Sequence, residues 1–157
     1  MAIRAFFPTL LYHRTLGLPA AGRLSRDLAD ECAALAASDT AGQRWSARHY
    51  LGGYTSYGSH DRLHKVSSLF AGLQRRIDPH VRAFVKRLGF EAGDRPLAMT
   101  DCWVNVMPAG VVHSLHLHPG SAISGTYYVA VPRGSSNFIA PDPVSYTHLT
   151  LPTIYSV

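Results

Sequence analysis

Apolar residues recur at helical spacing in two stretches of the N-terminal half of the chain. Residues 20–37 predict an amphipathic helix, because their apolar positions repeat every three or four residues. The second stretch keeps the same spacing from Leu63 to Leu88, over seven turns. Ser59 or Asp61 can cap the start of this second helix, and Gly89 can end it.

A proline interrupts the second helical pattern. Pro79 lacks the backbone N–H and clashes with the preceding turn, so we expect a kink or two abutting helices, with Asp78 capping the second. Between the two helical stretches, residues 38–57 contain glycine, serine and arginine and predict a long connector. Within that connector, Gly52–Tyr57 predicts a short extended piece followed by a loop.

The composition changes after residue 96. Residues 97–107, 111–118 and 123–131 are rich in valine, isoleucine, tyrosine and tryptophan, and turns containing proline and glycine separate them. Helices followed by regularly spaced short strands predict an α+β fold, in which a helical layer packs on an antiparallel sheet or barrel.

Length and charge narrow the class of protein. The 157 residues fit one domain with its own core, and two cysteines exclude a disulfide scaffold. The net charge of +5 is spread along the chain, which disfavours nucleic acid as a partner. No apolar run is long enough to span a membrane, and we find no signal peptide. We therefore expect a cytoplasmic protein with no membrane partner and a small-molecule or protein substrate, and leave a homodimer open.

Two histidines near the end of the second predicted strand are the main candidates for chemistry. His116 and His118 would face the same side of a strand about 6–7 Å apart, so both imidazoles can reach one ion. Neutral imidazole suits iron, zinc, copper and nickel. His113 would face the other, apolar side, and we assign it a structural role. Because paired histidines are often ordinary polar residues of a surface or core, the spacing alone leaves both interpretations open.

Several other conspicuous residues are predicted to pack rather than react. Trp103 is expected in the core, and Cys32 and Cys102 are expected to be buried thiols, since neither lies in a metal-ligand spacing. Tyr127 and Tyr128 would fall on opposite faces of a strand, so at most one of them lines an interior site.

A spaced pattern of residues runs through the C-terminal half. It consists of W-x-N at Trp103–Asn105, then Gly110, H-x-H-P-x-S at His116–Ser121, S-G-x-Y-Y-V at Ser124–Val129 and the pair Asp142-Pro143. This pattern resembles an uncharacterised bacterial group of 2-oxoglutarate/Fe(II)-dependent oxygenases, and the resemblance covers most of the chain up to Asp142. It implies a double-stranded β-helix, or jelly roll, behind an N-terminal helical layer.

The same resemblance implies roles for individual residues. His116 and His118 would bind Fe(II), and Asn105 would hydrogen-bond the co-substrate 2-oxoglutarate, since alkylation-repair-type members of the superfamily have an asparagine at this spacing. Tyr127 and Ser124, from the S-G-x-Y-Y-V segment, are assigned to the same co-substrate site.

The chain departs from the superfamily pattern in two ways. His118 stands where a carboxylate usually completes the ligand triad, so the site would be neutral rather than anionic. The distal histidine, and the arginine or lysine that pairs with the far carboxylate of 2-oxoglutarate, come late in the fold and would lie beyond Asp142.

The last fourteen residues, 144–157, have a separate origin in our interpretation. Val144–Thr153 is identical over ten residues to the conceptual translation of a transposase adapter used in sequencing libraries. We therefore expect residues 1–143 to hold the helical layer and the first strands of a jelly-roll domain truncated at its C-terminus, and residues 144–157 to be a non-native tail. With part of the site missing, the chain as given is expected to be inactive.

Two other functions stay open beside an oxygenase that hydroxylates an unknown substrate. One is a cupin-like metal-binding protein that is not an oxygenase, and the other is a non-catalytic β-domain that binds sugar or protein. A downstream histidine and basic residue in the native gene would favour the oxygenase. Unchanged metal content after His116→Ala and His118→Ala would favour the β-domain.

Overall fold

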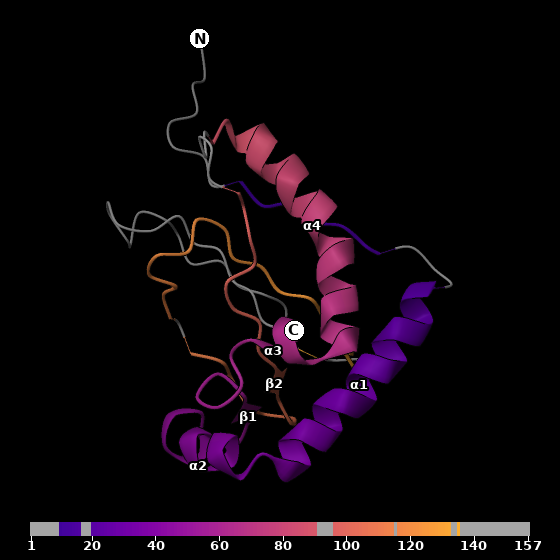
Figure 1. Ribbon diagram of the computed structural model, residues 1–157. Coiled ribbons are helices and arrows are strands. Elements are labelled where there is room, and N and C mark those ends of the chain that lie inside the picture. Colours follow the sequence, from indigo (N-terminus) through magenta and orange to yellow (C-terminus); the bar gives the residue numbers. More distant parts are fainter. Residues whose placement is uncertain (1–9, 17–19, 91–95, 115, 133–134, 136–157) are drawn as a thin grey trace.

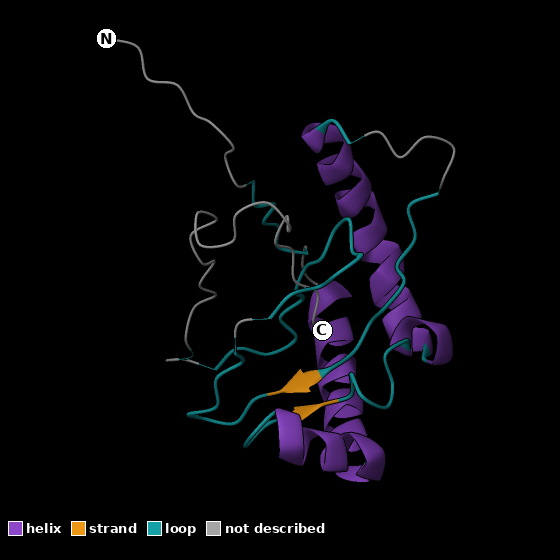
Figure 2. Ribbon diagram, turned by 90° about the vertical axis from the view of Figure 1, so that its left-hand side faces the viewer, coloured by secondary structure: helices purple, strands orange, loops and turns teal. Residues whose placement is uncertain are grey.

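The computed structural model describes residues 10–16, 20–90, 96–114, 116–132 and 135. These residues form helices and a small two-stranded sheet, an α+β arrangement. Figures 1 and 2 show two long helices crossing beside the sheet, with a short helix beneath it and extended segments over it. Among the described helices, none is both long and apolar enough to cross a membrane.

The first predicted helix is confirmed as α1, Ala20–Ser38. Its apolar face is buried at Leu24, Leu28 and Cys32, as the spacing predicts. Phe70 and Leu73 of the other long helix join the same apolar cluster, so the two helices bury their faces against each other.

The connector predicted for residues 38–57 contains a helix that the sequence pattern did not indicate. This helix, α2, spans Thr40–His49, and Asp39 caps it by accepting a hydrogen bond from the Gly42 N–H at 2.9 Å. The helix buries only Gly42 and Ser46, so it has no apolar stripe to detect. The extended piece predicted at Gly52–Tyr57 is confirmed as β1, Tyr54–Thr55.

The second predicted helix is divided into two. A single turn, α3, spans Leu63–Val66, and α4 spans Ser68–Leu88. Ser67 between them has extended backbone angles, and its hydroxyl accepts a hydrogen bond from the Phe70 N–H at 3.3 Å. The prediction that Ser59 or Asp61 caps the helix was therefore wrong, because this serine caps the long helix further along the chain.

Pro79 lies inside α4, which continues through it to Leu88. Figure 1 shows α4 changing direction about midway along its length, in agreement with the predicted kink. Asp78 is an internal residue of α4, so the prediction that it caps a separate helix was wrong. Gly89 ends the helix as predicted, with the positive φ of 66° that a residue without Cβ adopts readily.

The sheet joins two segments that are far apart in the sequence. β1 pairs antiparallel with β2, Asn105–Val106, so that Tyr54 lies opposite Val106 and Thr55 opposite Asn105. On the outer side of β1, the Ser46 hydroxyl accepts from the Thr55 N–H at 3.0 Å and donates to the Thr55 carbonyl at 3.3 Å. The Ser46 side chain of α2 therefore pairs with the backbone groups of Thr55 that a further strand would otherwise bond along this edge of the sheet.

The predicted strands at 111–118 and 123–131 were wrong for the residues described there, which have no strand pairing. The turns between the runs are present, with positive φ at Gly110 and Gly120 and a hydrogen bond from the Ser121 N–H to the His118 carbonyl. Alternation of apolar residues indicates how side chains can face, whereas a strand also needs a neighbour for its N–H and C=O groups. Within the described part of the chain, β1 and β2 are the one pair of strands whose backbone groups bond to each other in a sheet.

Candidate functional site

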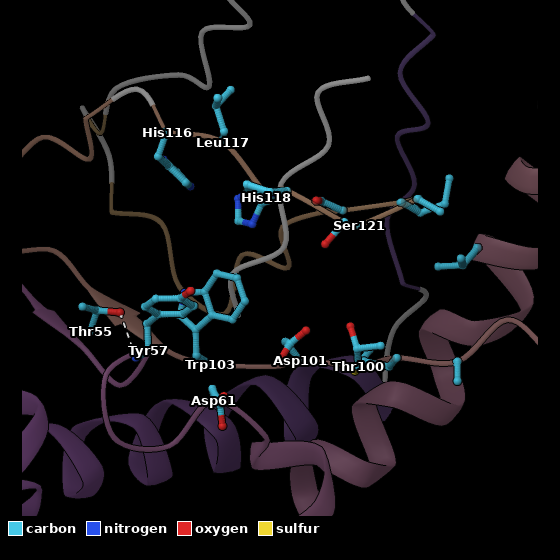
Figure 3. A pocket seen from close by; sticks show the side chains of 18 of the residues that line it. Thr55, Tyr57, Asp61, Thr100, Asp101, Trp103, His116, Leu117, His118 and Ser121 are labelled. Atoms are coloured by element: carbon cyan, nitrogen blue, oxygen red, sulfur yellow. Dashed lines mark hydrogen bonds between the residues drawn. The ribbon is translucent and has the colours of Figure 1, made fainter. Parts of the chain in front are cut away.

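A cavity of about 570 Å³ lies between the segment around Trp103 and the segment from His113 to Ser124. The loop after β1 and the middle of α4 complete its wall. Figure 3 shows His116, His118 and Ser121 on one side of this space, and Tyr57, Trp103 and Asp101 on the other. One face of the cavity therefore comes from the segment with the histidine motif, and the other combines Trp103 with residues of the N-terminal half such as Tyr57.

The histidines of the motif cluster at this cavity. The ring centroids of His116 and His118 are 4.8 Å apart, and those of His113 and His116 are 4.2 Å apart with the rings stacked. The expectation that His113 faces away from the pair was wrong, because residues 112–114 are not a strand and do not alternate between two faces. The structure thus brings three imidazoles together where the sequence predicted two.

The hydrogen bonds of the predicted ligands leave ring nitrogens free. The His116 Nδ1 lies 2.9 Å from the Ser114 carbonyl oxygen, which can only accept, so this contact places the proton on Nδ1 and leaves Nε2 with its lone pair. The His118 Nε2 is buried and has no hydrogen-bond partner among the described residues. A buried ring nitrogen without a partner is a group that a metal ion would satisfy.

Burial also favours the neutral, metal-binding form of two imidazoles of the cluster, His113 and His118. Desolvation, together with the neighbouring imidazoles, lowers the pKa of His113 to about 4. The pKa of His118 is lowered for the same reasons, first by burial and then by His116. Both rings are therefore uncharged near neutral pH.

The residues present could occupy two positions of a metal site. The imidazoles of His116 and His118 are of the donor type that suits Fe(II). Among the described residues, no group of three His, Cys, Asp or Glu side chains is arranged to hold one ion, and this includes His113. The distal histidine expected beyond Asp142 lies outside the described residues, as does the basic residue expected to pair with 2-oxoglutarate.

The three residues assigned to the co-substrate lie in different surroundings. Ser124 lines the cavity, and its buried hydroxyl has no partner among the described residues. Asn105 lies in β2 outside the cavity lining, although both polar atoms of its buried amide also lack partners. The Tyr127 hydroxyl is 2.8 Å from the Ser25 hydroxyl of α1, and its ring packs on the apolar core. Only Ser124 therefore shares the cavity with the histidine pair.

Sequence reasoning missed the aromatic wall of the cavity. The rings of Trp45, Tyr57 and Trp103 form consecutive edge contacts, and Trp103 also stacks on His118 at a centroid distance of 5.6 Å. Trp103 is buried, as predicted, but one side of it belongs to the site rather than to the apolar core. Tyr57 lies in the Gly52–Tyr57 segment, which was predicted only as a short extended piece followed by a loop, so no pattern in the sequence linked it to the two tryptophans.

The two free cysteines take no part in the cavity. Cys32 and Cys102 are buried within the apolar cluster, as predicted. Desolvation raises the pKa of each thiol to about 11, so neither is a reactive thiolate at neutral pH.

Comparison with known proteins gives one family match. The sequence model of a family described as "Putative 2OG-Fe(II) oxygenase" matches residues 101–154. The matched segment contains His116, His118 and the cavity wall from Asp101 to Ser124. No curated protein sequence matches the chain. The match supports an oxygenase-like domain in the C-terminal third, at the level of the family.

Proposed function

We propose that this chain belongs to a 2-oxoglutarate/Fe(II)-dependent oxygenase in which His116 and His118 are two of the iron ligands. The observation that carries the proposal is the pair of imidazoles 4.8 Å apart at a cavity, one with a buried, unpartnered Nε2. The family match over residues 101–154 supports the same assignment.

In this proposal each residue of the site has a defined task. The Ser114 carbonyl fixes the tautomer and orientation of His116, and Trp103 covers the face of His118 and keeps water from it. Ser124 offers an unpaired hydroxyl to a carboxylate of 2-oxoglutarate from the cavity wall, whereas Asn105 and Tyr127 lie outside the cavity lining. When bound, Fe(II) with 2-oxoglutarate and O₂ supplies the oxidising chemistry that hydroxylates a substrate C–H bond.

We further propose that the native domain is a double-stranded β-helix behind the helices, completed by a distal histidine and a basic residue after Asp142. In this view residues 144–157 are a non-native tail. The family match ends at residue 154, inside that segment, so it does not decide the origin of the tail. Sequencing the source gene across these codons would decide the origin of the tail. An adapter origin requires that the intact gene continue after Asp142 with unrelated codons.

An anaerobic titration tests the metal site without requiring turnover. Fe(II) and 2-oxoglutarate together should give a charge-transfer absorbance band that neither gives alone. His116→Ala and His118→Ala should abolish the band, whereas His60→Ala, which removes an exposed imidazole, should retain it. Because the third ligand lies outside this cluster, we expect a weak complex and no 2-oxoglutarate turnover by the chain as given.

The titration also separates the alternative functions. Metal bound through the two histidines with no 2-oxoglutarate-dependent band would favour a cupin-like metal protein. Metal content that is the same in both alanine variants as in the unmodified chain would refute the metal site and favour a non-catalytic binding domain.

A further inference from the structure

The wall opposite the histidine pair combines aromatic rings with a carboxylate. In Figure 3 the Asp101 side chain lies next to Trp103, on the side of the cavity that faces His118. The ring of Tyr57, with 52% of its surface exposed, lies beside Trp103 at a centroid distance of 5.1 Å. Aromatic faces and carboxylates both attract cations, and neither group attracts an anion.

Among the described residues that line the cavity, negative charges outnumber positive ones. These residues include three carboxylates, Asp61, Asp78 and Asp101, and one guanidinium, that of Arg82, whereas the chain carries a net charge of +5. In the part of the chain that the structure describes, the Asp101 side chain makes no hydrogen bond or ion pair. The buried His64 nearby does not neutralise it, since desolvation lowers the pKa of that imidazole. A partly buried carboxylate without a partner is a position at which a bound cation gains energy.

Two hydroxyl groups add a second, independent sign of a ligand. Tyr50 and Ser124 each have 6% of their surface exposed, line the same cavity and have hydroxyl groups without partners among the described residues. Because Ser124 is assigned to 2-oxoglutarate, the Tyr50 hydroxyl is the one left for a second ligand. Leaving a buried hydroxyl unpaired costs free energy, and a ligand atom that accepts from it would recover that cost. A carbonyl or amide oxygen is an acceptor of the required kind.

We infer that the cavity binds a ligand carrying a cationic amine, held at Asp101 against Trp103 and Tyr57, and a carbonyl group that accepts from the hydroxyl of Tyr50. This inference names the substrate class of the site and so rests on the proposed function. A lysine side chain with its backbone amides has both groups, and a free polyamine has only the first.

Both tryptophans of the chain, Trp45 and Trp103, line the cavity, so intrinsic fluorescence reports its occupancy. The metal-free protein, with chelator present, is titrated with Nα-acetyl-lysine amide, with the norleucine analogue that lacks only the amine, and with the glutamate analogue. The lysine probe should bind at least about tenfold more tightly than either analogue, a factor typical of one charge-assisted contact. Free 1,5-diaminopentane distinguishes a lysine side chain of a peptide from a free polyamine as the natural ligand. Weaker binding than that of the lysine probe indicates a peptide side chain, and equal binding indicates a free amine.

Matched variants locate the two contacts. Asp101→Asn should weaken the lysine probe about tenfold and leave the norleucine probe unchanged, and Asp30→Asn, on the exposed face of α1, should change neither. Tyr50→Phe should weaken the amide probes but not 1,5-diaminopentane. It should also leave the midpoint of urea unfolding unchanged or raised, because the hydroxyl it removes has no partner in the free protein.

The results distinguish the inference from the proposed function. Equal binding of the lysine and norleucine probes, preference for the glutamate probe, or an Asp101→Asn variant with normal affinity for the lysine probe would each overturn the inference. Selective amine binding without an iron-dependent band would support the inference and refute the oxygenase. An iron-dependent band without amine selectivity would support the oxygenase and refute the inference.

Discussion

Ser56 is the residue at which the supports of the cavity can be tested most directly. It is completely buried, and its hydroxyl donates to the His60 carbonyl at 2.9 Å and accepts from the Val104 N–H at 3.1 Å. Its own backbone N–H donates to the Val104 carbonyl at 3.0 Å. Ser56→Ala removes the first two bonds, of which the one to His60 closes the turn after β1 and the one from Val104 joins that turn to the residue next to Trp103.

The expected loss of stability follows from these contacts. Val104 is only 1% exposed, so its N–H would be left without water, at a cost of about 1–3 kcal/mol. The His60 carbonyl belongs to an exposed residue and can turn to water, so its lost bond costs about 0.5–1.5 kcal/mol. Removing one oxygen leaves almost no cavity, and the sum for Ser56→Ala is about 1.5–4.5 kcal/mol.

Urea unfolding followed by tryptophan fluorescence measures this loss. With a slope of about 2 kcal/mol per molar urea, Ser56→Ala should lower the unfolding midpoint by about 1–2 M. Ser25→Ala is the matched control, because it removes a partly buried bond to the Tyr127 hydroxyl whose partner keeps some exposure. A midpoint shift for Ser56→Ala no larger than that for Ser25→Ala would refute the reasoning.

Two further predictions concern stability elsewhere. Gly58→Ala should destabilise the protein by about 1–3 kcal/mol, because the new Cβ would lie 2.5 Å from Cγ of Trp45. Gly72→Ala, whose new Cβ on α4 would meet only the Arg75 side chain at 3.8 Å, should stabilise the protein by about 0.5–1 kcal/mol. Equal effects of Gly58→Ala and Gly72→Ala in thermal unfolding would contradict this difference in packing. Burial acts to raise the pKa of Asp39, but three hydrogen bonds outweigh it and hold this pKa below its usual range. The stabilisation that the ionised Asp39 contributes is complete above the unfolded pKa of about 4 and is lost as the pH falls through the folded pKa. As the pH is lowered from about 5 to 2, the urea unfolding midpoint should therefore fall more steeply for the unmodified chain than for Asp39→Asn.

Helices with an apolar stripe could be predicted from the sequence, and those without one could not. The face formed by Leu24 and Leu28 gave the bounds of α1 almost to the residue. The α2 helix depends on Asp39 as its cap and on Ser46 against β1, which are polar contacts that leave no periodic pattern. The break at Ser67 was missed because a serine cap can interrupt a helix without disturbing the spacing of its apolar residues.

The site could be predicted only as far as it depends on neighbours in the sequence. The proximity of His116 and His118 follows from their spacing in either a strand or a tight loop. The placement of His113 and Asp101 at one cavity depends on how two segments come together, the one that contains His116 and His118 and the one that contains Trp103, which no spacing encodes. Tyr50 comes from the end of α2, so its contribution becomes visible only when that helix is placed against the cavity.

The pairing of β1 with β2 has a consequence for how the cavity comes into being. Thr55 lies opposite Asn105, fifty positions later, so this contact closes a loop that contains both α3 and α4. Closing such a loop costs about 3.5 kcal/mol in chain entropy, more than two ladder pairs return by themselves. The closure is therefore stable only together with the burial of Tyr54 and Val104 in the apolar cluster. We therefore expect the β1–β2 contact to open only when the core opens, so the amide hydrogens of Ser56 and Val104 should report one common free energy of opening in hydrogen exchange, that of global unfolding.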